Sequence, residues 1–478
     1  GPVAILAQAF ECGAMFWLLP SVLAIPPDFA RAHGTLEWCD CGAGLANVTV
    51  WPRGEKTQAR TVVLGSGANW IDWEAAVDEV EWVCDGMEDV QRSRMSAAGR
   101  YWTVTHSTWE KGLGCGKKSG RLQVATWTPS DYNTSVVYVS GEGGYACLKI
   151  PVLLATRAGT LLAFAEARKD DCSDFAWTDL VVKRSEDGGL TWSQMQVIRS
   201  ESGPGLPHTV IGNAAPAQLL EDSRYPGRIV VPHTRNNSDV WRTWSDDDGL
   251  TWAKAEMIPG GSAPGWKWVG TGPPASLVLR RAHRGRIIVP SYHSKYRGNL
   301  ANNIVHGHVM LSDDDGDTFR LASVGGFGAA DKKTNENQAV ELGNGSVLIN
   351  ARSLANPLVN QERIQTRSDD GGETFGPTRF VPELPQPVDG CEGSLVAVDE
   401  AGSQALYYSG PDSKVLRTGM SVWKSGNEGE SWSKVFAVDA GMSGYSAMQA
   451  VPKGLALLYE QSDEQQVVMN PDRFVFRV

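Results

Sequence analysis

The sequence lacks an uninterrupted apolar run long enough to cross a bilayer, which takes about 20 residues in a helix. The nearest candidate, residues 14–25, is interrupted by Pro20. An excess of positive charge is also absent, because 44 lysines and arginines stand against 55 aspartates and glutamates, for a net charge of -11 at pH 7. We therefore expect neither a membrane span nor a nucleic-acid partner, while a locally basic pocket remains compatible with this balance.

Cysteine is scarce, and the eight that occur show no spacing typical of a zinc site. Cys39 and Cys41 are too close for the usual paired-cysteine knuckle, and no metal is expected. Five cysteines precede residue 141 and three follow it, so either one disulfide joins the two parts or some thiols are free. Disulfides favour a secreted or cell-surface protein. A secreted or cell-surface location is also indicated by N-glycosylation sequons at Asn47, Asn133, Asn236 and Asn344.

What the sequence does contain is a recurring eight-residue phrase, Ser-x-Asp-x-Gly-x-Thr-Trp/Phe. Its five copies begin at Ser185, Ser245, Ser312, Ser368 and, in a degenerate form, Ser425, with steps of 60, 67, 56 and 57 residues. One turn motif per step of this size indicates a repeated supersecondary unit. Aspartate accepts local backbone hydrogen bonds and glycine supplies positive φ, so each copy predicts a hairpin turn rather than a ligand. Small sheets that close in a ring form a β-propeller.

The distribution of the phrases divides the chain into two predicted domains. All copies fall within residues 141–478, which are long enough for six blades of four strands. Residues 1–140 contain no copy but hold nine of the 18 tryptophans. We interpret them as a separate β-rich domain of unknown role, with one possible helix at residues 73–85. The expected fold is all-β, a six-bladed propeller preceded by this domain.

Charged and hydroxyl side chains set in apolar strand segments are the candidates for chemistry, because propeller ligands usually lie in the central channel. Four groups of segments combine these features. They are residues 145–151 with 161–168 and 172–174, residues 335–338 with 347–352, residues 414–417, and residues 442–446 with 457–460.

These segments, in this order and around these phrases, resemble the sialidase (exo-α-neuraminidase) superfamily over residues 141–478. The resemblance implies a six-bladed propeller that removes terminal sialic acids from glycans and retains the anomeric configuration. It implies a substrate such as Neu5Ac or Kdn on a sialylated glycan, and neither a metal nor an organic cofactor. We expect a monomer.

The resemblance also assigns roles residue by residue. Asp174 corresponds to the acid/base, Glu336 to the glutamate that accepts a proton, and Tyr445 to the nucleophile. Three cations correspond to those that bind the substrate carboxylate, and three further residues support them. The cations are Lys149, Arg352 and Arg417, and the supporting residues are Glu166, Arg168 and Glu460.

This residue set suits an anionic sugar. Guanidinium groups match a carboxylate in bidentate fashion and stay charged. A neutral tyrosine is not repelled by the substrate carboxylate, and sialidases are a known exception to the two-carboxylate rule of glycosidases. Tyrosine is a weak nucleophile because its pKa is about 10, so a general base must accept its proton.

Several assignments remain open at the level of sequence. Asp170, Asp171 and Asp179 compete with Asp174, and Glu341 competes with Glu336. Tyr292, His293 and His208 could also line the cavity.

Two segments depart from the family pattern. Lys149 stands where the family has arginine, which keeps the charge but loses the two-donor fork. Residues 175–178, which follow Asp174, also depart from it, so the preferred C5 substituent is open. A sialic-acid-binding propeller without hydrolysis, a trans-sialidase and a protein-binding scaffold are the competing functions.

Overall fold

A computed structural model of the chain divides into two units, residues 1–133 and 134–478. In the first unit it describes only the eight strands β1–β8, by their backbone. In the second it describes residues 134–478 except 202–204, 297–304, 328–332, 355–360, 401 and 464–469. Among the described residues, no helix has the length and apolar character needed to cross a membrane.

The described strands of the first unit form two four-stranded antiparallel sheets. One has the order β4 (Trp70–Trp73), β1 (Ala32–Glu37), β8 (Arg121–Thr126) and β7 (Tyr101–Thr105). The other has the order β3 (Arg60–Leu64), β2 (Ala46–Pro52), β5 (Val77–Cys84) and β6 (Gln91–Arg94).

The predicted helix at residues 73–85 is wrong, because Val77–Cys84 is strand β5. Apolar residues at 73, 77, 80 and 84 fit a helical period, but those at 80, 82 and 84 equally fit a strand. In the structure, residues 77–84 pair with β2 on one side and with β6 on the other, which makes the segment a strand.

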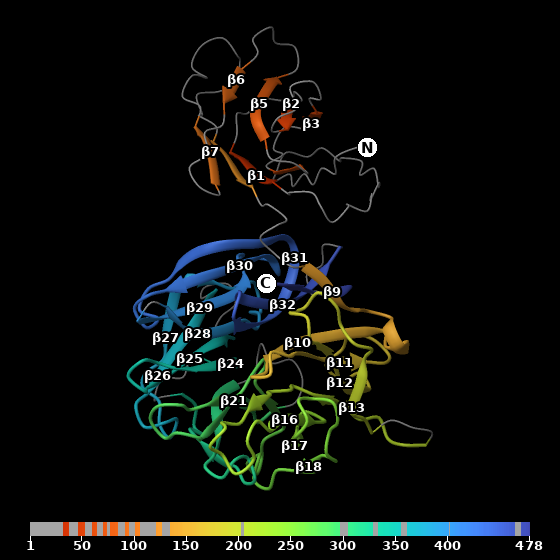
Figure 1. Ribbon diagram of the computed structural model, residues 1–478, viewed down its shortest axis with the longest axis vertical. Coiled ribbons are helices and arrows are strands. Elements are labelled where there is room, and N and C mark those ends of the chain that lie inside the picture. Colours follow the sequence, from red (N-terminus) through yellow and green to blue (C-terminus); the bar gives the residue numbers. More distant parts are fainter. Residues whose placement is uncertain are drawn as a thin grey trace. The chain divides into compact units, whose positions relative to one another are not determined.

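The second unit is built from antiparallel sheets that follow one another around it in chain order (Figure 1). The first contains β10 (Cys147–Ala155), β11 (Leu161–Arg168), β12 (Thr178–Ser185) and β13 (Gln196–Arg199). The second contains β14 (Ile211–Gly212), β15 (Ala217–Gln218), β16 (Ile229–Arg235), β17 (Asp239–Ser245) and β18 (Glu256–Met257).

The third sheet contains β19 (Trp268–Thr271), β20 (Leu277–Val278), β21 (Ile287–Ser294), β22 (Val305–Ser312) and β23 (Arg320–Ala322). The fourth contains β24 (Thr334–Glu341), β25 (Val347–Ser353), β26 (Glu362–Ser368) and β27 (Arg379–Pro385). This arrangement of sheets is propeller-like and all-β, and the helical element within the described part of this unit is the short 3-10 helix η2 (Glu142–Gly144).

The last sheet has seven strands in the order β28, β29, β30, β31, β32, β33, β9. Their bounds are β28 (Ser394–Glu400), β29 (Ser403–Pro411), β30 (Thr418–Ser425), β31 (Ser433–Val451), β32 (Gly454–Ser462), β33 (Arg473–Arg477) and β9 (Thr134–Val139). The 19-residue β31 pairs with β30 up to Met442 and with β32 from Met442 onward.

Strand β9 belongs to the second unit because it pairs with β33 at the other end of the sequence. The division after Asn133 therefore lies seven residues before the predicted boundary at residue 140. No sequence signal marks this pairing, because β9 contains no recurring phrase and its partner is distant along the chain.

The buried apolar residues form clusters between consecutive sheets. One cluster joins the first and second sheets, and others join the second to the third, the third to the fourth and the fourth to β28–β30. A further cluster lies between β28–β30 and the strands β31–β33, and another joins β31–β33 and β9 back to the first sheet. The core is thus distributed around the unit rather than concentrated in one layer.

The recurring phrases form equivalent turns: the first four connect the last two strands of their sheets, and the fifth connects β30 to β31. In the copy at 185–192, Gly189 N–H donates to Ser185 Oγ at 2.8 Å, and Thr191 N–H donates to Asp187 Oδ1 at 3.0 Å. The glycine-to-serine bond recurs in the other four copies at 2.8–2.9 Å. The phrase aspartates are therefore occupied by turn hydrogen bonds, as predicted.

Candidate active site

The strand directions bring the predicted site residues to one end of the propeller-like unit. Lys149 and Glu336 lie near the beginning of β10 and β24, the first strands of their sheets, and Tyr445 lies near the beginning of the part of β31 that pairs with β32. Arg168 and Arg352 lie near the end of the following, antiparallel strands. The beginning of one strand and the end of its antiparallel neighbour share an edge. A cavity of about 300 Å³ opens there, with Glu166, Arg168, Asp174, Glu336, Arg352 and Tyr445 in its lining.

Tyr445, Glu336 and Arg352 form a closed hydrogen-bonded triangle. The Tyr445 hydroxyl donates to Glu336 Oε1 at 2.5 Å, while Arg352 Nη1 donates to Glu336 Oε2 at 2.7 Å and to Tyr445 Oη at 2.8 Å. Tyr445 and Glu336 are 6% and 5% exposed. Burial raises the pKa of the Tyr445 phenol well above its usual value, while the charge of Arg352 opposes this shift. The tyrosine is therefore neutral until its proton moves to a partner, and Glu336 is within reach.

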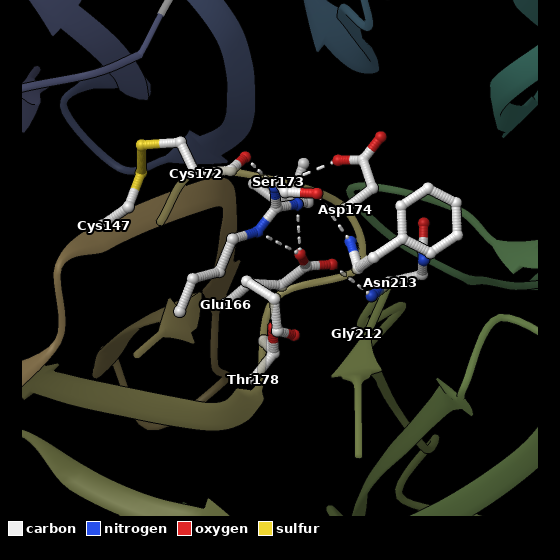
Figure 2. A network of polar contacts seen from close by, with 12 residues as sticks. Cys147, Glu166, Cys172, Ser173, Asp174, Thr178, Gly212 and Asn213 are labelled. Carbon is white, nitrogen blue, oxygen red and sulfur yellow. Dashed lines mark hydrogen bonds and ion pairs between the residues drawn. A yellow bond between two sulfur atoms is a disulfide. The ribbon is translucent and has the colours of Figure 1, made fainter. Parts of the chain in front are cut away.

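Asp174, labelled in Figure 2, lies on the loop between β11 and β12. Arg168 holds its side chain. Arg168 Nη1 donates to Asp174 Oδ1 at 3.0 Å, and Arg168 Nη2 donates to Glu166 Oε2 at 2.6 Å. The protein around the Asp174 carboxyl displaces part of its hydration and so raises its pKa, but the charges of Arg168 and Lys149 outweigh this effect, and the pKa lies below its usual value. The side chain of Asp174 is 63% exposed, so it can contact a molecule in the cavity.

The other two predicted cations, Lys149 and Arg417, are not part of the cavity lining. Lys149 is 7% exposed, and burial lowers its pKa together with the charges of Arg168 and Arg417, while Glu460 raises it. Arg417 stacks over the Tyr445 ring at 5.0 Å and donates to the Gly390 carbonyl at 3.4 Å. Glu460 accepts hydrogen bonds from the backbone N–H groups of Ile150 and Tyr445, each at 3.1 Å. Of the three cations, Arg352 alone is part of the cavity lining.

Known proteins resemble this chain in family, sequence and fold. A model of the BNR repeat-like domain family matches residues 159–457. The chain belongs to this family. Sialidase from Micromonospora viridifaciens is 28% identical over 359 residues, which are 69% of this chain and 52% of that protein. Sialidase-2 from Mus musculus is 27% identical over 364 residues, which are 68% of this chain and 92% of that protein.

Solved structures of similar fold include the Hadza microbial sialidase Hz136, with a TM-score of 0.61 and 19% identity over 95% of this chain and 94% of that one. An intramolecular trans-sialidase from Ruminococcus gnavus has a TM-score of 0.59 and 17% identity over 72% of this chain and 96% of that one. The family model and these relatives, which are named sialidases, together support the sialidase superfamily. The chain spans about half the length of the Micromonospora relative.

Within this family member, the structure separates the residues that compete for the same role. Glu341 lies at the opposite end of β24 from Glu336, and its carboxylate accepts the N–H groups of Arg280 and Arg281, each at 2.8 Å. Asp179 accepts the Tyr145 hydroxyl at 2.8 Å. Neither carboxylate is part of the cavity lining.

The cavity also contains residues to which the sequence reasoning gave no role. They are Ile150, Val210, Asn213, Asn237, Trp268, Asn335, Leu354 and Asp389. Tyr292, a candidate lining residue from the sequence, and Phe175, in the segment that departs from the family pattern, also line the cavity. Asn213, Asn237 and Asp389 have positive φ values of 55°, 52° and 63°. Asparagine and aspartate tolerate this conformation better than most residues. Their occurrence at these three positions is therefore a local sequence signal for turns with positive φ. His293 instead stacks on Trp266 with ring centroids 3.7 Å apart.

One turn fixes Arg352 through backbone carbonyls. Arg352 Nε donates to the Asp389 carbonyl at 3.0 Å and Nη2 donates to it at 2.6 Å. Gly390 follows with φ of 71°, and a Cβ there would lie 2.8 Å from Arg352 Cγ and 2.9 Å from its Nε. A side chain at residue 390 would therefore displace the arginine.

We expect Gly390→Ala to raise KM for an anionic sialoside more than it lowers kcat, because it moves a group expected to bind the substrate carboxylate. A positive φ adds backbone strain of about 1–3 kcal/mol, so a lower melting temperature is also expected. Steady-state kinetics at several substrate concentrations measure the first effect. Gly402→Ala, in the turn between β28 and β29, is also at positive φ but has no atom within 4 Å of the added Cβ, so it controls for strain. An unchanged KM in Gly390→Ala would contradict the positioning of Arg352 by this turn.

Proposed function

We propose that this chain is a retaining exo-sialidase that hydrolyses terminal α-linked sialic acids of glycoconjugates through Tyr445. The observation that carries the proposal is the 2.5 Å hydrogen bond from the Tyr445 hydroxyl to Glu336, inside a cavity that also holds Asp174 and Arg352. A nucleophile hydrogen-bonded to a base, with an acid across the same cavity, is the arrangement needed for a double displacement.

The proposed reaction begins with the sugar carboxylate on Arg352, supported by Arg417 and Lys149. Tyr445 Oη attacks the anomeric carbon while its proton passes to Glu336, and Asp174 donates its proton to the departing glycosidic oxygen. Asp174, now ionised, then takes a proton from water, whose oxygen displaces Tyr445, and Glu336 returns the phenolic proton. Two displacements at one carbon retain its configuration.

The pH dependence follows from the depressed pKa of Asp174. The acid must be protonated to act, so kcat/KM for natural glycosides should fall as pH rises through the free-enzyme pKa of Asp174. A bound substrate carboxylate offsets the positive charges of Arg168 and Lys149, which raises the pKa of Asp174 in the complex. Because kcat reports the complex and kcat/KM the free enzyme, we expect the kcat profile to extend to higher pH. Coincident profiles would contradict this electrostatic account.

We also propose that the second unit is a six-bladed propeller and that residues 1–133 form an accessory β-rich domain. Six apolar clusters separate successive groups of strands in the described part of residues 134–478, and one of them divides the seven-stranded sheet between β30 and the second half of β31. A six-membered ring of sheets accounts for these six interfaces. The disulfide between Cys147 and Cys172 supports a secreted or cell-surface location.

Intramolecular trans-sialidase activity is the second candidate, because one of the structural neighbours is such an enzyme. Assays of α-sialosides that carry N-acetyl, N-glycolyl or hydroxyl groups at C5, with NMR of the first product, test both functions. An α-configured free sugar supports the retaining hydrolase, and an anhydro sugar supports the trans-sialidase. Binding without turnover of any α-sialoside would instead indicate a lectin.

Lys149→Ala tests whether Lys149 contributes to carboxylate binding. A charge-assisted hydrogen bond is worth about 1.5–3 kcal/mol, so kcat/KM should fall by about 10- to 150-fold. Replacing the substrate carboxylate with a neutral amide should weaken the wild type strongly and the variant much less. If the two changes are additive, Lys149 does not interact with the carboxylate and acts only through the buried network of Glu460 and Arg417.

A further inference from the structure

A disulfide links the strand that carries Lys149 to the loop that carries Asp174. Cys147 and Cys172 are bonded, with their Cα atoms 5.2 Å apart (Figure 2). Cys147 lies two residues before Lys149, and Cys172 lies two residues before Asp174. The bond therefore restrains the proposed acid relative to the β10 edge of the cavity.

Besides this bond, a small set of contacts holds the loop, among them the Phe175 ring on Trp268, with centroids 5.7 Å apart, and Asp170 at 3.2 Å from His208 Nε2. Residues 170–175 form no strand, and five of these six residues are exposed. The base of the loop is closed by the Lys169 N–H, which donates to the Trp177 carbonyl at 2.8 Å. On its cavity side, Asn237 Nδ2 donates to the Asp174 carbonyl at 3.2 Å. Exposed segments with few packed contacts open at low free energy, so the position of Asp174 depends on its tethers.

Arg168 is the second tether, and it is rigid. Its Nη1 donates both to the Cys172 carbonyl and to Asp174 Oδ1, while its own side chain is 2% exposed. Glu166 fixes Arg168 through Nη2 and Nε, at 2.6 and 3.2 Å, and accepts the Asn213 N–H at 2.7 Å. Arg168 also faces Cys147 across the β10–β11 ladder. The ion pair and the disulfide thus meet at the same point of the loop.

The two tethers have different consequences for an acid. A hydrogen bond from a cation favours the ionised carboxylate and opposes its protonation. When Asp174 carries the proton needed for catalysis, its attraction to Arg168 is weakened. A disulfide is uncharged, so it restrains the loop equally in both protonation states.

We propose that the Cys147–Cys172 disulfide is a positioning element for Asp174, which holds the protonated acid in reach of the leaving oxygen. The inference rests on the proposed sialidase function and adds a covalent restraint to it. Misplacement of a catalytic group by about 1 Å can cost on the order of 100-fold in rate, which makes such a restraint significant.

The test uses the full chain with Cys147→Ser and Cys172→Ser combined, and compares two leaving groups. For sialyllactose, whose leaving alcohol needs a proton, we expect kcat/KM to fall by about 10- to 100-fold. For an aryl sialoside, whose phenol leaves with little protonation, we expect a much smaller loss. Introducing Asp174→Asn into both proteins should abolish this difference, because the acid that the bond positions is then absent.

A second measurement avoids dependence on folding of the variant. Treating folded wild type with a phosphine supplies two electrons, giving two thiols and a phosphine oxide whose oxygen comes from water. After reduction, kcat/KM should again fall much more for sialyllactose than for the aryl sialoside. The double serine variant under the same treatment controls for effects on other cysteines, such as the buried Cys391. Equal losses on both substrates, or no loss after complete reduction of the bond, would overturn the positioning role. Failure of untreated wild type to cleave either substrate would instead refute the proposed function.

Discussion

Tyr445→Phe is expected to lower kcat/KM for sialyllactose by at least about 100-fold, the lower range of what a positioned proton-transfer group contributes. The substitution removes one oxygen, and with it both the proposed nucleophile and the hydrogen bond to Glu336. Binding of free sialic acid should change little, because Arg352 keeps its bonds to Glu336 and to the Asp389 carbonyl. Steady-state kinetics and calorimetry measure the two effects separately.

Tyr459→Phe provides the matched control. Its hydroxyl is also lost from a buried tyrosine, but it donates to Asp439 at 2.9 Å, outside the cavity. We expect this variant to lose stability and to retain kcat/KM. Turnover by Tyr445→Phe within about tenfold of wild type would remove Tyr445 from the mechanism, since that is far less than a proton-transfer group contributes.

Asp174→Asn is expected to have the second largest effect, and one that depends on the leaving group. Natural glycosides should lose about 100- to 10,000-fold in rate, because an amide cannot supply the proton to the departing oxygen. Aryl sialosides should lose much less. A plot of log kcat/KM against leaving-group pKa should therefore become steeper in the variant.

Asp171→Asn is the control for this change. Asp171 lies in the same exposed loop and accepts the Ser173 N–H at 2.7 Å, a bond that an amide oxygen preserves. It is not part of the cavity lining, so its substitution should leave the plot unchanged. Equal slopes for wild type and Asp174→Asn would contradict the role of Asp174 as the acid.

Some of the site was accessible to sequence reasoning because it depends on spacing within strands. Glu336 and Arg352 lie near the beginning and end of two consecutive antiparallel strands, so the hairpin brings them to one edge, and the structure gives a 2.7 Å ion pair between them. The choice between Glu336 and Glu341 was open, because both lie on β24 and are buried in the same way. Which end of β24 faces the cavity depends on the other sheets.

The sequence by itself determined the turns. In the first four phrases the serine, aspartate, glycine and threonine bond to one another within eight residues, so no distant part of the chain is needed. In the fifth phrase an asparagine and a serine replace the aspartate and threonine and make the equivalent bonds. It also determined the sialidase superfamily, because the chemically distinctive residues occur in a fixed order.

Only the tertiary structure decided how the distant residues meet. It pairs β9 with β33, joins Cys147 to Cys172, and places the Asp389 carbonyl on Arg352. It also leaves Lys149 and Arg417 out of the cavity lining. Local propensity can specify a turn, but the depth of a buried cation depends on charges contributed by strands that are remote in sequence, here Glu460 for Lys149.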